Sequence, residues 1–95
     1  MAYNGAKFLN IAGAATTTVK SSSGVLIGMT CNKAVANGVI TIYNNTAASG
    51  TKIATITHPA TLLQNQYDLD FKRIGFTIGL TVVTGAADDI TFIYE

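Results

Sequence analysis

The sequence is poor in the residues that cross-link, rigidify or charge a small domain. Cysteine, proline, histidine and glutamate occur once each, tryptophan is absent, and 12% of the 95 residues carry a charge. Because Cys31 is the single cysteine, an intrachain disulfide is excluded, and stability must come from packing or association. The formal net charge of +1 provides no field that would attract nucleic acid or an anionic membrane surface. We therefore expect neither partner.

The sequence also lacks the hydrophobic runs that direct a chain to a membrane. Residues 1–13 hold one lysine and scattered apolar residues, without the continuous apolar core of about 7 to 15 residues found in a signal peptide. The longest apolar-leaning run, Ile74 to Gly85, is interrupted by glycine and threonine and is far shorter than the ~20 residues of a spanning helix. We therefore expect synthesis and assembly in a cytoplasm, and no membrane span.

Apolar residues, in contrast, are abundant for so short a chain, at 48% of the sequence. A chain of this length fits one domain, expected here over residues 1–95. A domain of this size hides only about 60 to 65% of the surface of its extended chain. Part of the apolar surface should therefore be covered by another protein, which favours a homo-oligomer.

Threonine and the other β-branched residues predict the fold class. The chain contains fourteen threonines, and β-branched side chains pack well on a pleated sheet. No stretch of twelve residues keeps a helical apolar spacing free of glycine. We therefore expect an all-β domain, a single antiparallel β-sandwich that resembles a jelly roll. Period-two alternation and turn residues predict about eight short strands, at residues 8–12, 15–20, 25–31, 39–43, 52–57, 66–71, 76–82 and 90–94.

The same alternation predicts which side chains face the core. We expect residues 39–43 to form a central strand covered on both sides, joined to residues 52–57 as a hairpin, with a turn at Asn37-Gly38 before it. The other inward-facing side chains should be Val25, Ile27, Met29 and Cys31, then Tyr67, Leu69 and Phe71, then Phe76, Ile78, Leu80 and Val82, then Ile90, Phe92 and Tyr94.

Residues that could carry catalysis are few. Nucleophilic catalysis of the Ser/His/Asp kind needs a base, and His58 is the single histidine. Pro59 places His58 at a strand end, so we interpret it as an ordinary turn histidine. Cys31 alternates with apolar residues and should behave as a buried small hydrophobe. We therefore expect no catalytic residue and no enzyme, and a hydrolase is the weakest hypothesis.

The carboxylates do not form a metal-binding pattern. Asp68 and Asp70 share one face of a strand, where we expect them to be solvated, and Asp88-Asp89 should cap a turn. Calcium needs six or more oxygen ligands, and zinc usually four ligands from cysteine and histidine, at spacings that are not found here. We therefore expect no metal ion and no cofactor.

Five residues are candidates for a contact surface. Lys72-Arg73 is an adjacent basic pair, which we interpret either as a solvated strand end or as a contact to an acidic partner. Tyr3 and Tyr43 fall outside the expected core and would be available to a glycan, although tryptophan is lacking. Phe8 begins a weak first strand, residues 8–12. This strand lies within residues 1–13, which could instead be an arm reaching a neighbouring subunit.

Residues 20–95 resemble small all-β virion proteins of tailed bacteriophages. The similar stretches are GVLIGMTCNKAVANGVITIYNNTAASGTKIATIT over Gly24 to Thr57, the following HPATLL, and the C-terminal GLTVVTGAADDITFIYE. The resemblance implies a non-enzymatic part of the virion, assembled in the host cytoplasm. A capsid decoration or cement protein on the major capsid protein is the leading hypothesis, with a homotrimer as first choice and a dimer second. The alternative is a glycan-recognising module of a tail or fibre tip.

Overall fold

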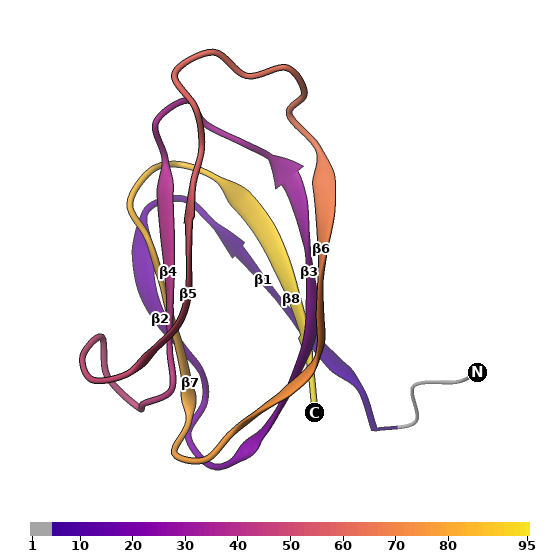
Figure 1. The fold of residues 1–95 in the computed structure, drawn as a ribbon, viewed down its shortest axis with the longest axis vertical. Helices are drawn as coiled ribbons and strands as arrows, with labels where there is room; N and C mark the ends of the chain where they lie inside the picture. The colour runs from indigo at the N-terminus through magenta and orange to yellow at the C-terminus, as the bar shows by residue number, and fades with distance from the viewer. Residues whose placement is uncertain (1–4) are drawn as a thin grey trace.

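The computed structural model describes residues 5–95, which form eight β-strands (Figure 1). The prediction of an all-β domain is confirmed. Within this range no helix has the length and apolar character that crossing a membrane requires. The strands are β1 (Lys7–Ala12), β2 (Ala15–Lys20), β3 (Gly24–Lys33), β4 (Val39–Tyr43), β5 (Lys52–Thr57), β6 (Tyr67–Phe76), β7 (Leu80–Thr84) and β8 (Asp89–Tyr94).

The strands form two four-stranded antiparallel sheets that pack face to face as a sandwich (Figure 1). The first sheet has the order β1-β8-β3-β6, and the second has the order β2-β7-β4-β5. Strands therefore pair first with last: β1 with β8, β2 with β7, β3 with β6 and β4 with β5. This folded-ribbon pairing is the eight-stranded jelly-roll arrangement. The expected jelly-roll sandwich is confirmed, as is the hairpin of β4 and β5.

The core lies between the two inner faces. Its largest fully buried side chains are Phe76 and Phe92. In β4, Ile40 and Ile42 are completely buried, whereas Thr41 between them is half-buried on the outer face. The expectation that β4 is covered on both sides was therefore wrong, because only its inner face meets another layer. The remaining core residues are Ile11, Leu26, Met29, Cys31, Ala34, Leu80, Val82 and Ile90.

A β-bulge shifts the side-chain alternation expected along β3. The register of β3 with both neighbouring strands is interrupted between Leu26 and Gly28. Ile27 is the extra residue opposite β8, whereas opposite β6 the extra residues lie in β6, between Asp70 and Ile74. A bulge of this kind reverses the alternation on one side of the insertion. As a result Leu26 is fully buried in the core, while Val25, expected to face inward, is half-buried.

The β6–β7 region also departs from the expected boundaries. β6 continues to Phe76, so Lys72 and Arg73 lie inside the strand and not at its end. Both adopt positive φ, 55° and 58°, which bends the strand locally. Ile78 was expected in the core but is 54% exposed, because it lies in the β6–β7 turn, where its N–H donates to the Asn44 side chain at 2.9 Å.

The N-terminal segment enters the first sheet. β1 pairs with β8 from Lys7 to Ala12, and Ile11 contributes to the core. The weak first strand predicted at residues 8–12 is therefore confirmed. The arm expected at residues 1–13 contains this edge strand, and residues 1–4 lie outside the described part of the chain.

Candidate functional site

The candidate site lies at the end of the sandwich where the β3–β4 connection (residues 34–38) meets the β5–β6 connection (residues 58–66). Backbone hydrogen bonds join the two connections: Ala34 donates to Asn65 at 2.9 Å, and His58 donates to Gly38 at 2.8 Å. Asn37, with φ of 63°, turns the chain into β4, as the Asn37-Gly38 pair predicted. These bonds hold the long β5–β6 connection against the body of the domain.

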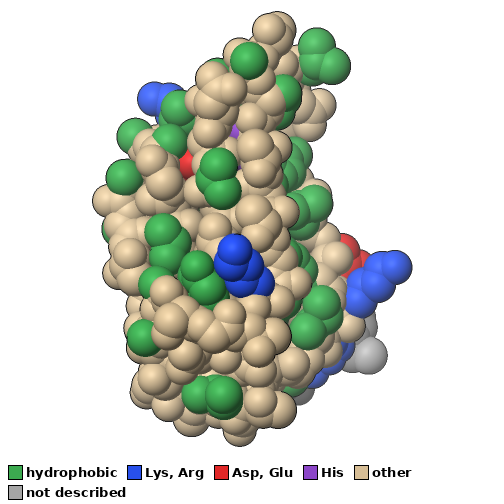
Figure 2. Space-filling model, turned by 60° about the vertical axis from the view of Figure 1, so that its left-hand side comes forward, with side chains coloured by type: hydrophobic (Ala, Val, Ile, Leu, Met, Phe, Trp, Pro, Cys, Tyr) green, Lys and Arg blue, Asp and Glu red, His purple; other side chains and the backbone are tan. Residues whose placement is uncertain are grey.

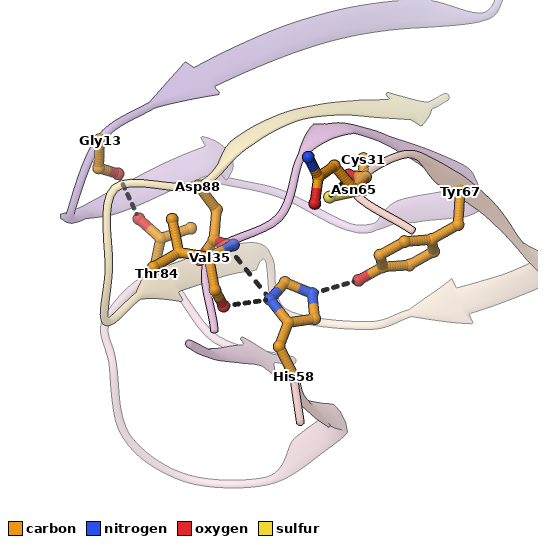
Figure 3. A network of polar contacts seen from close by, with 8 residues as sticks. All are labelled: Gly13, Cys31, Val35, His58, Asn65, Tyr67, Thr84 and Asp88. Carbon is orange, nitrogen blue, oxygen red and sulfur yellow. Dashed lines mark hydrogen bonds and ion pairs between the residues drawn. The ribbon is translucent and has the colours of Figure 1, made fainter. Parts of the chain in front are cut away.

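A buried histidine occupies the centre of this end (Figure 3). His58 is 4% exposed and lies between Tyr67 and Asp88. Its Nε2 is 2.5 Å from the Tyr67 hydroxyl, and its Nδ1 is 3.2 Å from Asp88 Oδ1 and 3.2 Å from the Val35 carbonyl oxygen. The interpretation of His58 as an ordinary turn histidine was therefore wrong.

Asp88 is completely buried on the other side of His58. Its Oδ1 accepts a hydrogen bond of 2.7 Å from the Val35 N–H, across the β3–β4 connection. Its Oδ2 is buried without a hydrogen-bond partner among residues 5–95, which is a costly arrangement for a carboxylate. The expected role in capping its own turn was wrong: Asp88 fixes a different connection from inside the domain.

The proton positions follow from the surroundings of each group. Burial raises the pKa of Tyr67 to about 12, so its hydroxyl keeps its proton and can donate to His58 Nε2. Nδ1 faces two oxygen acceptors and is therefore the donating nitrogen on that side. The donors run in one direction, from the Tyr67 hydroxyl through His58 to the Val35 carbonyl oxygen, and Asp88 Oδ1 lies at ion-pair distance from the same His58 nitrogen.

This order resembles a catalytic triad in which a phenol replaces the nucleophile. Burial also raises the pKa of the neighbouring Cys31 thiol. A nucleophile needs the opposite shift, toward a thiolate or phenolate at neutral pH. The same contacts do fit a structural role, because they tie β6, the β5–β6 connection, the β3–β4 connection and the β7–β8 turn to one ring.

Two shallow depressions flank Tyr67. A polar one of about 350 Å³ is lined by Thr30, Cys31, Asn32, Gln66, Tyr67 and Asp68. An apolar one of about 320 Å³ is lined by Ala34, Ile56, Thr57, His58, Pro59, Leu62, Leu63, Gln64 and Tyr67. Both are open to solvent, and Leu63 at the rim of the second is 97% exposed. In the described range, no three His, Cys, Asp or Glu side chains gather into a metal-binding group.

The residues expected at a contact surface are spread over the molecule. Phe8 is 74% exposed on edge strand β1, and Tyr43 is half-buried at the end of β4 in the other sheet. Lys72 is exposed in β6, and Arg73 next to it forms an ion pair with Glu95. Tyr3 lies outside the described residues. The structure therefore does not gather these positions into one site.

The charged residues divide unequally between the two sheets. The strands of the β2-β7-β4-β5 sheet contain no acidic residue, and their two lysines, Lys20 and Lys52, stand at strand ends. The strands of the other sheet contain Lys7, Lys33, Asp68, Asp70, Lys72, Arg73 and Asp89. Figure 2, which brings forward the side where β2, β4 and β7 lie in Figure 1, shows one basic side chain in the middle of a mostly uncharged surface, with the other charged side chains toward the edges of the view.

Sequence reasoning found neither this division nor the buried network. Comparison with known proteins adds no assignment: no family model, no curated protein and no solved structure matches this chain.

Proposed function

We propose that this chain is a non-enzymatic structural protein of a phage virion, a decoration protein that self-associates and docks on the major capsid protein. The jelly-roll order is compatible with this role, since it recurs in viral capsid domains, but it also recurs in lectins. Fold alone does not decide function. The proposal therefore depends on the surface of the sandwich.

The observation that carries the proposal is the nearly uncharged outer face of the β2-β7-β4-β5 sheet. Alternation with the buried Ile40 and Ile42 places Thr41 on this face, and pairing across the sheet aligns it with Val83 and Thr55. The face also includes Thr16, Thr18, Val39, Tyr43 and Thr57, and its one lysine by this register, Lys52, lies opposite Tyr43 at the end of β5. Such a surface loses little hydration of charge and little side-chain freedom when another protein covers it.

A matched pair of variants tests this docking face. Thr41 in β4 and Thr30 in β3 are both half-buried threonines on the outer faces of inner strands, one in each sheet. Thr41→Lys places a charge in the proposed contact and should abolish cosedimentation with purified capsid shells of the phage that encodes the protein. Thr30→Lys should bind as the parent protein does.

Ionic strength provides a second readout of the same contact. A contact made by uncharged surface should weaken by much less than tenfold between about 50 and 500 mM salt. A steep salt dependence would instead indicate docking through the exposed basic residues of β6. If Thr41→Lys binds normally, the assigned face is wrong. If the parent protein binds no shell but retains a glycan, the tail or fibre-tip hypothesis replaces this one.

A further inference from the structure

The four edge strands of the sandwich differ in how well they are protected. The sheets end in β1 and β6, and in β2 and β5. The pairing of β2 is irregular between Thr18 and Lys20, that of β5 is irregular opposite Ile42 and Tyr43, and β6 contains the two positive-φ residues. Bulges and charged residues on an edge prevent it from accepting another strand.

β1 has neither a register shift nor a positive-φ residue over its described length, and its one charged residue, Lys7, stands at its first position. It pairs with β8 through six consecutive residues without a register shift. The Gly13 N–H donates to the Asp88 carbonyl oxygen at 3.0 Å, beyond the end of this ladder. Because backbone groups alternate in direction along an antiparallel strand, the N–H and C=O groups of Phe8, Asn10 and Ala12 point away from β8. They line the edge of the sheet, where no strand within residues 5–95 pairs with them, and the Phe8 side chain is 74% exposed.

We propose that β1 pairs antiparallel with β1 of a second copy of this chain across a twofold axis. The contact would join the two β1-β8-β3-β6 sheets into one sheet and leave neither β1 edge open. An isologous contact of this kind closes at two copies, so it selects a dimer over the trimer. The proposal specifies the self-association within the proposed function and in that respect rests on it.

The sequence of β1 is self-complementary in one register. When Asn10 lies opposite the partner's Asn10, Leu9 faces the partner's Ile11 on the inner side. On the outer side Phe8 faces the partner's Ala12, a large side chain against a small one. This register pairs apolar side chains with each other and keeps the two Lys7 side chains apart, whereas like charges placed opposite each other destabilise a sheet.

Cysteine cross-linking tests both the edge and the register. Asn10 and the partner's Asn10 would form a hydrogen-bonded pair with Cα atoms about 5.5 Å apart, within the range of a disulfide. Asn10→Cys should therefore form a disulfide-linked dimer on air oxidation. Ala12→Cys is the matched control, because position 12 lies opposite position 8 and far from its own copy. Cys31 does not interfere, since it is completely buried.

Proline substitution tests the backbone pairing without new chemistry. Ala12→Pro removes an outward N–H that makes no bond within its own sheet, which an edge strand tolerates. The control is Thr55→Pro on the edge strand β5. The His58 N–H points toward β4, because it donates to the Gly38 carbonyl oxygen. The N–H direction alternates along the strand, so the Thr55 N–H, three residues earlier, points away from β4. Light scattering should show the parent protein and Thr55→Pro at about twice the 9.9 kDa chain mass, and Ala12→Pro as a monomer. Circular dichroism checks that both variants remain folded.

The outcomes separate this proposal from the proposed function. A trimeric parent protein, cross-linking at position 12 in place of position 10, or a folded Ala12→Pro dimer would each overturn the β1 contact. A monomeric parent protein would overturn self-association as well. A dimer that links through position 10 but binds no capsid shell would support the β1 contact and contradict the docking role.

Discussion

Asp88 and Asp89 are neighbours in the chain, yet their surroundings have almost nothing in common. Asp88 is completely buried, accepts the Val35 N–H and faces His58. Asp89 lies at the start of β8 on the outer surface, where it accepts side-chain hydrogen bonds from Asn10 at 2.7 Å and Asn32 at 3.2 Å. The Asp88 carboxylate therefore binds buried groups inside the domain, whereas the Asp89 carboxylate links β8 to β1 and β3 on the outer surface.

The difference shows how strongly the direction of a side chain decides what it can do, since Asp88 ends the β7–β8 turn and Asp89 begins β8. Asp89 has solvent and two amide donors, so its charge is compensated, and those hydrogen bonds lower its pKa. Asp88 has no solvent, and one of its oxygens has no partner in the described residues. The two carboxylates should therefore respond very differently to the same substitution.

The largest expected effect comes from removing each carboxylate in turn. Asp88→Ala leaves the Val35 N–H without its buried acceptor and removes one of the two oxygens that face His58 Nδ1. Since each buried donor left unpaired costs about 1–3 kcal/mol, the free energy of unfolding should fall by about 2–4 kcal/mol. This is a large fraction of the ~5–14 kcal/mol expected for a domain of this size. Asp89→Ala should shift the urea midpoint only slightly, because water replaces the lost contacts. Equal shifts for the two variants would contradict the contrast.

A second prediction concerns the glycine that packs against Asp88. A Cβ on Gly38 would lie 2.9 Å from Asp88 Oδ2 and 3.0 Å from the Val35 carbonyl oxygen. Gly38→Ala should displace the carboxylate and cost about 1–3 kcal/mol, as overpacking of a buried position usually does. Gly85→Ala is the control at a turn of the same end, where the nearest contact is 3.3 Å. Equilibrium urea unfolding of both variants measures the difference, and a larger loss for Gly85→Ala would show that the Asp88 pocket is not tightly packed.

Much of the fold could be predicted because its signals are local. Alternating Thr, Val and Ile mark the strands, and Asn37-Gly38 marks a turn through the left-handed conformation that Asn37 adopts. The errors arise where tertiary contacts override local pattern. The residue types of Lys72 and Arg73 do not predict two successive positive φ values. Ile78 is exposed because it lies in the β6–β7 turn, which is hydrogen-bonded to the Asn44 side chain.

The site could not be predicted from spacing. His58 lies in the β5–β6 connection, Tyr67 at the start of β6 and Asp88 in the β7–β8 turn, and the jelly-roll pairing brings the three together. A lone histidine before a proline resembles any strand end, and the first aspartate of an Asp-Asp pair resembles any turn. One feature of the sequence could have indicated the network. Tyr67 was expected to face inward, a buried tyrosine hydroxyl needs a hydrogen-bond partner, and the sequence contains few side chains that could be that partner.

A third prediction uses the hydroxyl that donates to His58. Tyr67→Phe removes this hydrogen bond and should cost about 1–2 kcal/mol at neutral pH. The folded-state pKa of about 12 lies above the ordinary value of 10, so the stability linked to this proton is complete below pH 10 and is lost as the pH rises toward 12. The difference between the parent protein and Tyr67→Phe should therefore shrink above pH 10. A difference that stays constant through that range would place the hydroxyl in solvent.

The smallest expected effect is the acid response of Asp89. Hydrogen bonds from Asn10 and Asn32 hold its pKa below the ordinary value of 3.8. A depressed carboxyl pKa contributes stability above the unfolded-state value, and this contribution is lost as the pH falls through the folded-state value. Asp89→Asn should therefore weaken the dependence of the urea midpoint on pH below about 4. Asp68→Asn, an exposed carboxyl substitution on the same outer face, is the matched control. If the pH dependence of the urea midpoint changes equally in both variants, the hydrogen bonds from Asn10 and Asn32 do not give Asp89 a special contribution to acid stability.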